Sequence, residues 1–483
     1  RNIHFPDSFE NLEAARRRFS FEELFYLSLG LALLRERRSR GEGPVFQAAE
    51  LEAFERLLPF ALTGAQRRAV REAAADMTSG RPMNRLVQGD VGSGKTAVAA
   101  ACAWLAFRAG WQCAMMAPTE ILAEQHARSL SVLLAPAGMT VGLLTGSMRA
   151  AEKRAVYAAL GSGALSFVVG THALLSEGVT FQRLGLVITD EQHRFGVQQR
   201  ADLAMKGEEV HTLVMSATPI PRTLAMMIYG DLDISVLDEL PPGRQEIRTD
   251  VVTSAYHARI FRFLRAALDR GEQGYIVCPL VDEGESEMKA ATAYAAQLSE
   301  TELFGYNLGL LHGKMTPKQK DAVMQAFARG DVQVLVATTV VEVGVDVPNA
   351  TVMIVENAER FGLSQLHQLR GRIGRGSAKS YCILVSDAKG DTARQRLLTM
   401  KKYSDGFKIA DEDLRLRGPG DFFGKRQHGL PELRLADMME DMDTLRLCRD
   451  CADTILADDP NLDKPENQPL LTETQDLFRR STT

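Results

Sequence analysis

Residues 89–96 combine glycines, a lysine and a threonine at a spacing that can bind phosphate. They read GDVGSGKT, which fits the pattern G-x-x-x-x-G-K-[ST]. Glycines let backbone N–H groups approach an anion, Lys95 adds positive charge at the terminal phosphates, and the Thr96 hydroxyl is suited to hold Mg²⁺. A glycine-rich turn that matches by chance is the alternative. The pattern predicts ATP and Mg²⁺ as ligands, contacted by Gly89, Gly92, Ser93, Gly94, Lys95 and Thr96.

Two adjacent carboxylates follow a later apolar segment, residues 184–189. Asp190 and Glu191 are expected where a strand ends. A carboxylate in that place can organise Mg²⁺, and its neighbour can polarise an attacking water. An Asp-Glu pair after a strand is common by itself. The assignment to metal and water therefore depends on its position downstream of a phosphate loop. Gln192 and His193 either sense the nucleotide or form local hydrogen bonds.

Residues 368–375 read QLRGRIGR and offer positive charge far along the chain from the phosphate loop. Gln368 begins the run, and Arg372 and Arg375 share a face of a helical turn. Guanidinium groups stabilise the charge of phosphoryl transfer, and arginines delivered from a second lobe would make hydrolysis depend on closure. A solvated basic helix is the alternative, in which the two glycines would cost stability.

Three further polar residues have candidate roles near a nucleotide. The Gln66 amide offers a donor and an acceptor, which suits the edge of an adenine; an ordinary helix start capped by Thr63 is the alternative. Ser216 and Thr218 follow another apolar strand, and their small hydroxyl side chains suit a switch between the nucleotide and a second lobe.

Positioning these groups requires parallel sheets. Short apolar segments alternate with helical stretches over residues 61–235 and again over 236–395. We therefore expect an α/β fold with two lobes in series, joined by a linker at residues 231–250. The strand candidates are residues 86–88, 113–117, 166–170, 184–189, 212–216, 274–279, 332–337, 351–355 and 381–385.

The two ends of the chain are predicted to be helical. Apolar residues recur at helical spacing over residues 21–29, with Ser20 as a possible N-cap. Residues 1–60 form the first helical segment, and residues 396–483 form a polar tail broken at 418–420. The basic run at residues 35–40 is expected to be a solvated helix end, with a nucleic-acid contact as the alternative.

The composition is typical of a soluble globular protein of several domains. The chain has 483 residues, 45% hydrophobic and 25% charged, with a net charge of −5, which excludes a globally basic nucleic-acid binder but not a local basic groove. No apolar run is long enough to span a membrane. Six scattered cysteines indicate reduced thiols, and Cys448 and Cys451 are expected to be helix positions rather than metal ligands.

Together these segments resemble the ordered motifs of superfamily 2 helicases. The matching positions are Gln66, residues 89–96, 117–120, 170–172, 190–193, 216–218, 311–315, 338–348 and 368–375. The resemblance implies two tandem RecA-like lobes, ATP hydrolysis, and nucleotide contacts by Gly344 and Asp346. It also places Thr119, Thr145, Gly146, His172, Ser216, Thr218 and Thr338 on DNA, although several of these residues could simply cap helices.

The match narrows to the bacterial RecG family of DNA helicases. Residues 190–200 (DEQHRFGVQQR), 216–223 (SATPIPRT) and 417–427 (RGPGDFFGKRQ) are similar to that family. The last segment resembles a translocation motif shared with the transcription-repair coupling factor, a translocase that acts on RNA polymerase. That factor is the alternative, but it typically carries Glu where this chain has Gln192. A plain helical cap is the alternative for the tail.

The resemblance implies an ATP-driven translocase that remodels branched double-stranded DNA in the bacterial cytoplasm, at the nucleoid. Its expected partners are forks, junctions and a single-stranded DNA-binding protein, with no membrane and a monomeric state. Arg396, Arg417 and Gln427 fall in the translocation motif. A nucleotide-gated binding module with a silent ATPase is disfavoured because the hydrolytic residues are all present.

RecG proteins carry an N-terminal wedge domain that splits the fork, and nothing in residues 1–60 fits it. Those residues look like the connector that follows the wedge. The chain starts with Arg1 rather than Met. We therefore expect a motor and translocation element that is part of a longer protein, and that binds forks and linear duplex with little discrimination.

Overall fold

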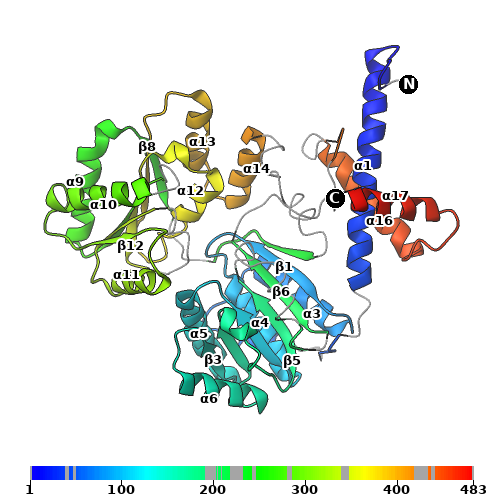
Figure 1. Cartoon of the computed structure of the whole chain (residues 1–483), viewed down its shortest axis with the longest axis horizontal. Helices are drawn as coiled ribbons and strands as arrows, with labels where there is room; N and C mark the ends of the chain where they lie inside the picture. The colour runs from blue at the N-terminus through cyan, green and yellow to red at the C-terminus, as the bar shows by residue number, and fades with distance from the viewer. Residues whose placement is uncertain are drawn as a thin grey trace.

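The computed structural model describes residues 3–38, 43–46, 51–190, 203, 205–207, 209–217, 232–241, 246–279, 285–338, 347–417, 433–436 and 441–480. This part of the chain forms two α/β lobes and a separate group of helices that brings together the two ends of the chain (Figure 1). The expected fold class, two tandem lobes with parallel sheets, is confirmed.

The first lobe contains, within the described residues, a parallel sheet in the order β3-β4-β2-β5-β6-β1-β7. Its strands are β1 (Asn84–Gly89), β2 (Gln112–Met116), β3 (Val141–Leu144), β4 (Phe167–Gly170), β5 (Leu184–Thr189), β6 (His211–Ser216) and β7 (Asp233–Leu237). Its helices are α3 (Gly64–Thr78), α4 (Lys95–Arg108), α5 (Glu120–Leu134) and α6 (Ala150–Gly161). Strands β2, β4 and β5 are buried along their whole length, as expected for strands covered on both faces.

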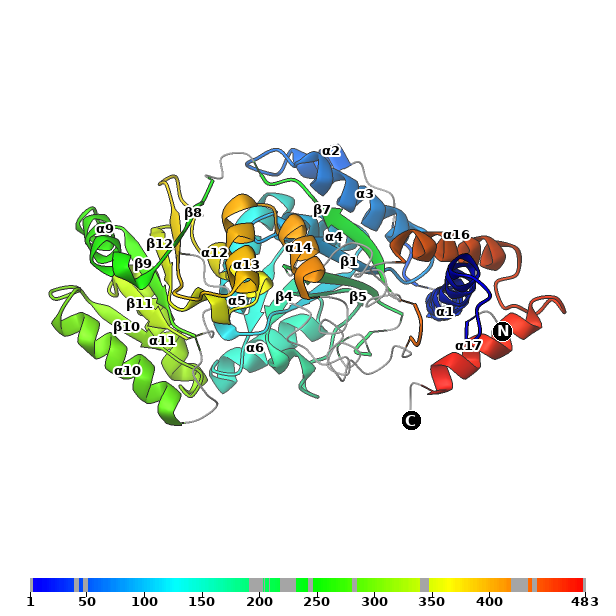
Figure 2. The same cartoon turned by 90° about the horizontal axis from the view of Figure 1, so that it is seen from above.

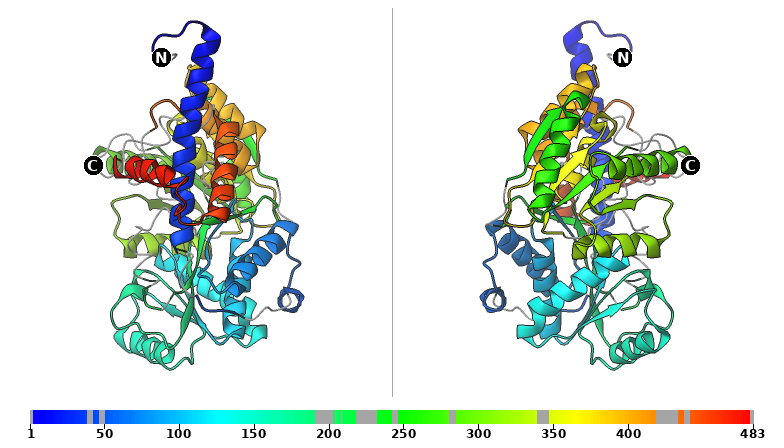
Figure 3. Two further views of the ribbon diagram at one scale, coloured as in Figure 1. Left: turned by 90° about the vertical axis from the view of Figure 1, so that its right-hand side faces the viewer. Right: turned by 90° about the vertical axis from the view of Figure 1, so that its left-hand side faces the viewer.

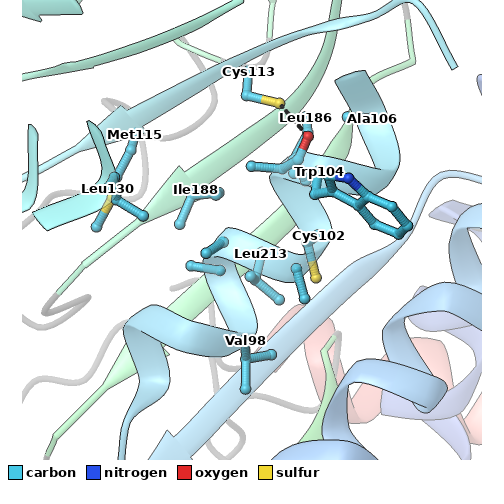
Figure 4. Packing of buried hydrophobic residues seen from close by; sticks show 14 of the residues in the cluster. Val98, Cys102, Trp104, Ala106, Cys113, Met115, Leu130, Leu186, Ile188 and Leu213 are labelled. Atoms are coloured by element: carbon cyan, nitrogen blue, oxygen red, sulfur yellow. Dashed lines mark hydrogen bonds between the residues drawn. The ribbon is translucent and has the colours of Figure 1, made fainter. Parts of the chain in front are cut away.

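The core of this lobe forms between α4 and the sheet. Ten consecutive residues of α4, Ala97 to Ala106, are buried, and their small side chains let the helix lie close to the strands. Figure 4 shows Val98, Cys102 and Trp104 beside strand residues. In the same view the Cys113 thiol donates to the Ala103 carbonyl at 3.6 Å.

The second lobe contains a parallel sheet in the order β10-β11-β9-β12-β13-β8. Its strands are β8 (Arg248–Val252), β9 (Gln273–Val277), β10 (Leu308–Leu311), β11 (Val334–Ala337), β12 (Ala350–Val355) and β13 (Tyr381–Val385). Its helices are α9 (His257–Asp269), α10 (Glu285–Glu300), α11 (Pro317–Arg329) and α12 (Leu363–Arg370). Helices α13 (Asp391–Lys402) and α14 (Gly406–Arg417) pack beside α12 (Figure 2).

The expected linker at residues 231–250 was a wrong interpretation. Strand β7 lies in it and pairs with β1, and β8 begins in it and pairs with β13. The expected lobe boundary at 235/236 therefore falls inside β7, and the first sheet extends to Leu237. The boundary expected at 395/396 likewise falls inside α13.

The first 60 residues divide between two neighbours. Helix α1 (Phe9–Arg38) packs against α16 (Met442–Asp458) and α17 (Gln468–Arg480), as Figure 3 also shows. By contrast, Phe46 and Phe54, the latter on α2 (Leu51–Glu55), belong to the core of the first lobe. The expected connector is therefore not one unit. The N-cap expected at Ser20 is also wrong, because α1 continues through that buried residue.

We call α1, α16 and α17 the terminal helices. Leu24 and Leu27 of α1 share a core with Leu445 and Cys448 of α16. The Glu23 carboxylate accepts hydrogen bonds from the backbone N–H groups of residues 434–436 at 2.9–3.2 Å. Cys448 is buried and Cys451 half-buried on α16, which confirms the expected helix positions. None of the helices within the described residues is long and apolar enough to cross a membrane.

Candidate functional site

The carboxyl edge of the first sheet gathers the expected motifs. All strand pairs in this sheet are parallel, so β1, β5 and β6 end on the same edge. The phosphate loop follows β1, Asp190 follows β5, and Ser216 ends β6. Ligands of open parallel sheets bind outside this edge. The topology thus brings together groups that are far apart in the sequence.

The phosphate loop has the backbone of an anion cradle. Gly92 and Gly94 have φ values of +80° and +81°, a conformation that favours glycine. A Cβ on Gly89 would lie 2.5 Å from Ser93 Oγ and 2.8 Å from Leu237 Cβ. Helix α4 starts at Lys95, so its free N–H groups and positive dipole end face the loop. The Lys95 ammonium donates to the carbonyls of Gly89 and Asp90 at 2.8 and 3.0 Å.

The side-chain amide of Gln66 forms hydrogen bonds with other residues of the first lobe. Its backbone N–H donates to Thr63 Oγ1 at 3.2 Å, and its Oε1 accepts from the Thr63 N–H at 2.9 Å, which forms a capping box. Its Nε2 donates to the carbonyl of Ser93 at 2.8 Å. A Cβ on Gly94 would collide with the same Nε2. The helix-start alternative therefore describes the local geometry, and adenine contact by Gln66 stays a prediction.

Asp190 is buried at the edge of the cradle. Its Oδ2 lies 2.8 Å from Nε2 of His126, which comes from α5. The two side chains are 11% and 14% exposed. A buried carboxylate and the threonine hydroxyl at the start of α4 are both oxygen donors, which is the ligand type that Mg²⁺ prefers. Thr96 and Asp190 therefore fit the expected metal by their chemistry, and metal binding by them stays a prediction. Glu191 lies outside the described residues.

The second lobe reaches the phosphate loop through α12. Nε2 of His367 lies 2.6 Å from Oδ1 of Asp90, inside the loop. The two residues are 277 positions apart, and their side chains are 4% and 15% exposed. A Cβ on Gly371 would lie 2.9 Å from Cβ of Val91. The two lobes thus touch at the loop itself, and Gly371 leaves no room for a side chain against Val91.

The expected arginines lie just beyond α12, which ends at Arg370, so the helical turn that was expected to place them on one face is not formed. Arg372 is buried and Arg375 is half-buried, with its Nε 3.3 Å from the carbonyl of Gly371. Gln368 is half-buried on α12. All three therefore belong to the segment that meets the phosphate loop. Their contact with a nucleotide stays a prediction.

The residues expected to contact DNA differ in their burial and in their hydrogen-bond partners. Thr119 caps α5, accepting from the Leu122 N–H at 3.3 Å, as the capping alternative describes. Thr145 is buried, with Oγ1 3.3 Å from Ser147 Oγ, and Gly146 accepts from Lys153 Nζ at 2.6 Å. His172 is exposed and begins η2 (His172–Leu175), the 3₁₀ helix that follows β4.

The remaining expected residues lie in or near the second lobe and the β6 edge. Ser216 and Thr338 are buried at strand ends. Arg396 of α13 is half-buried and donates from Nη2 to the carbonyl of Phe361. Outside the described part are Thr218, Gly344, Asp346 and Gln427, together with the side chain of Arg417.

Three residues at this site were not predicted: His126, His367 and Arg370. Arg370 is buried, and its Nη2 donates to Nδ1 of His367 at 2.9 Å. Burial lowers the pKa of Arg370, although guanidinium stays protonated in proteins. His126 and His367 lie outside the recognised motifs, and Arg370 lies within residues 368–375. The sequence signal was therefore two histidines and an arginine in or near those motifs, and it does not identify their hydrogen-bond partners.

Three family descriptions match separate parts of the chain. They are DEAD/DEAH box helicase over residues 63–227, helicase conserved C-terminal domain over 258–377, and ATP-dependent DNA helicase RecG, domain 3, C-terminal, over 403–482. The chain is 52% identical over 465 residues to the ATP-dependent DNA helicase RecG of Synechocystis, covering 95% of this chain and 56% of that protein. It is 47% identical to its counterpart in Bacillus subtilis, covering 96% of this chain and 69% of that protein. The chain thus spans little more than half of one relative and about two thirds of the other.

Comparison with solved structures also finds a RecG protein. A structure of RecG bound to a three-way DNA junction matches with a TM-score of 0.78 and 46% identity, covering 92% of this chain and 59% of that one. The DUF1998 helicase MrfA bound to DNA matches at a TM-score of 0.54 and 16% identity, over 76% of this chain and 56% of that one, which is a likeness of fold alone.

Proposed function

Because the chain belongs to the RecG family of ATP-dependent DNA helicases, we propose that it hydrolyses ATP to move along branched double-stranded DNA and remodel it. The substrates would be stalled replication forks and Holliday junctions, in recombination and repair. The observation that carries the proposal is the 2.6 Å contact between Asp90 and His367, because it joins the phosphate loop to the arginine-bearing segment of the other lobe.

Each residue of the cradle has a proposed role in hydrolysis. Lys95 binds the β- and γ-phosphates, and Gly89, Gly92, Ser93 and Gly94 line the loop with backbone N–H groups. Thr96 and Asp190 hold Mg²⁺, which supplies charge neutralisation to the phosphates when it is bound. Glu191 polarises the attacking water. Gln66, Gly344 and Asp346 contact the nucleotide.

The second lobe supplies positive charge on closure. Arg372 and Arg375 stabilise the charge that develops during phosphoryl transfer, and Gln368 lies on the same segment. Arg375 is half-buried just beyond α12, which supports this role, because a small shift of the second lobe would change its distance from the phosphate loop. Hydrolysis therefore requires both lobes.

DNA contact and coupling are assigned to the lobe surfaces and the tail. Thr119, Thr145, Gly146, His172, Ser216, Thr218 and Thr338 contact DNA phosphates, which gives binding without sequence preference. Arg396, Arg417 and Gln427 convert lobe motion into movement on the duplex. The junction-bound RecG structure supports branched DNA as the ligand. We propose that the protein acts in the bacterial cytoplasm, at the nucleoid. We further propose that it is a monomer and that it interacts with single-stranded DNA-binding protein. The coupling-factor alternative is not favoured, since the RecG description matches residues 403–482.

The test is the ATPase rate of the 483-residue chain without DNA, with linear duplex and with forked DNA. DNA should stimulate hydrolysis, and Lys95→Ala should abolish it in all three. In parallel, Gln427→Arg should keep most DNA-stimulated ATPase and lose branch unwinding. An ATPase rate that no DNA changes would refute the proposal.

A further inference from the structure

A continuous series of hydrogen bonds connects the phosphate loop to the turn between α13 and α14. Asp90 of the loop contacts His367, and His367 contacts Arg370 on the same helix. Arg370 in turn binds carbonyls at the end of α13 and in the turn that follows. We call this series the Asp90–Arg370 connection. Its members come from three parts of the chain: the loop after β1, helix α12, and residues 400–404.

The donors in this connection have only one consistent assignment. A guanidinium can only donate, so Nδ1 of His367 must accept the hydrogen bond from Arg370. The imidazole is then neutral and carries its proton on Nε2. That N–H donates to Oδ1 of Asp90, which also accepts from the Val91 N–H at 2.6 Å. His367 therefore links the position of Asp90 to that of Arg370, because each of its two nitrogens is hydrogen-bonded to a different partner.

Arg370 forms the end of the Asp90–Arg370 connection that lies at the turn between α13 and α14. Its Nη1 donates to the carbonyls of Met400 and Tyr403, both at 2.8 Å, and its Nη2 donates to the carbonyl of Ser404 at 3.0 Å. These carbonyls lie in the last turn of α13 and just beyond it, where the helix leaves acceptors unsatisfied. A buried positive charge at a helix C-terminus is also favourable to the helix dipole. Arg370 therefore determines where α13 ends relative to α12.

Asp90 is the residue whose contacts would change when phosphates occupy the loop. Its carbonyl accepts from Lys95 Nζ at 3.0 Å, while its side chain holds His367. When phosphates attract the Lys95 ammonium, the Asp90 carbonyl loses that partner and the residue can shift. Such a shift acts directly on His367, because the two side chains are in hydrogen-bond contact.

We propose that His367 is a positioning residue that reports nucleotide occupancy of the phosphate loop to the α13–α14 turn, through Asp90 on one side and Arg370 on the other. The inference rests on the proposed ATP site and deepens it. It assigns the link between hydrolysis and the tail to residues outside both the expected arginine pair and the expected translocation residues.

Two substitutions of His367 separate the two contacts. His367→Asn keeps an acceptor near the position of Nδ1 for Arg370 but has no atom that reaches Asp90. His367→Gln keeps a donor that reaches Asp90. His257→Asn is the matched control, because His257 begins α9 of the same lobe and pairs with Glu356 at 3.0 Å. Thermal melting of each variant checks that both lobes are folded.

The measurement is hydrogen exchange of residues 400–406, without nucleotide, with ADP and with a non-hydrolysable ATP analogue. In the unaltered chain and in His257→Asn, nucleotide should change the exchange rate at these residues. In His367→Asn the change should shrink by about 2- to 30-fold, the range expected for coupling through such a connection, while ADP still binds. His367→Gln should recover part of the response.

Two results would overturn the inference. One is a wild-type nucleotide response in His367→Asn. The other is loss of nucleotide binding in that variant, which would make His367 part of the binding loop. Both are distinct from failure of the proposed function, because exchange requires only nucleotide binding whereas the proposed function fails if the unaltered chain does not hydrolyse ATP.

Discussion

Nε2 of His126 lies 2.8 Å from Oδ2 of Asp190, so α5 supports the carboxylate at the end of β5. The two residues are 64 positions apart and both side chains are largely buried. A hydrogen bond at one carboxylate oxygen fixes the orientation of the other. His126 therefore orients a carboxylate that we assign to Mg²⁺.

Replacing His126 by Ala should weaken the metal site without removing it. Loss of an orienting partner typically costs about 10- to 100-fold in metal affinity or activity. We expect a rise of that order in the Mg²⁺ concentration that gives half-maximal ATPase. His126→Gln, which keeps a donor, should lie closer to the unaltered chain. Equal Mg²⁺ dependence for all three would contradict the role.

Arg375→Ala should lower kcat by a factor of about 10³ while leaving ATP binding largely intact, as for other arginine fingers. The physical reason is that the guanidinium stabilises charge that is present only in the transition state. Stopped-flow binding of a fluorescent ATP analogue and steady-state hydrolysis would measure the two separately. Normal turnover in this variant would refute a two-lobe site.

Gly371→Ala should hold the lobes apart. The backbone there has φ −65° and ψ −8°, which alanine adopts easily, so the local helix end is not strained. The new Cβ would instead lie 2.9 Å from Val91 Cβ and 3.1 and 3.2 Å from its methyl groups. Since a displacement of about 1 Å can cost 10²-fold, DNA-stimulated kcat should fall by about that factor.

The matched control for this change is Gly161→Ala, at the end of α6. Among the described residues, a Cβ there would meet Thr180 Oγ1 alone, at an ordinary contact distance of 3.7 Å. It should leave kcat unchanged. If both alanine variants behaved alike, steric contact across the lobes would not be the cause.

The stability of the first lobe should fall between pH 6.5 and pH 4 through His211. This residue is buried, and burial lowers its pKa to about 4. Its Nδ1 accepts from the Met83 N–H at 2.9 Å and its Nε2 lies 2.7 Å from the carbonyl of Pro44, an arrangement for a neutral ring. The unfolded chain takes up a proton near pH 6.5, which the folded lobe resists until about pH 4.

The sign follows from proton uptake: the unfolded state binds more protons in this window, so the free energy of unfolding decreases as pH falls. The total loss is up to about 3 kcal/mol. Urea unfolding at pH 7 and pH 5, followed by tryptophan fluorescence, isolates the effect because Trp104 and Trp111 both lie in the first lobe. His211→Asn should be less stable at pH 7 but lose less on acidification. An unchanged pH dependence would remove His211 as the cause.

Most of the strands that could be predicted are buried along most of their length. Residues 184–189 form an apolar run that ends in Thr189, and they match β5 residue for residue. The missed strands are short or lack that run: β3 and β10 have four residues each, and β7 and β8 carry charged residues. Their place in a sheet depends on neighbouring strands, and a local pattern does not contain that information.

The site could be predicted to the extent that its residues are contiguous. The phosphate loop needs one strand, one turn and one helix, all adjacent in sequence. The contact between Asp90 and His367 joins positions 277 residues apart, and no local rule pairs them. Ser20 illustrates the opposite error: a local N-cap signal was overridden because α1 continues toward its partners in the terminal helices.

The hydrogen bonds from residues 434–436 to Glu23 have a consequence for the order of folding. They close a loop of more than 400 residues, since Glu23 and Arg434 are 411 positions apart. At about 5–20 residues per second, the ribosome would need about 20–80 s to make the intervening chain. Throughout that time Leu24 and Leu27 have no access to Leu445 or Cys448. Helix α1 is synthesised before both lobes but is therefore among the last helices to acquire its native neighbours, and both lobes have to fold before those contacts form.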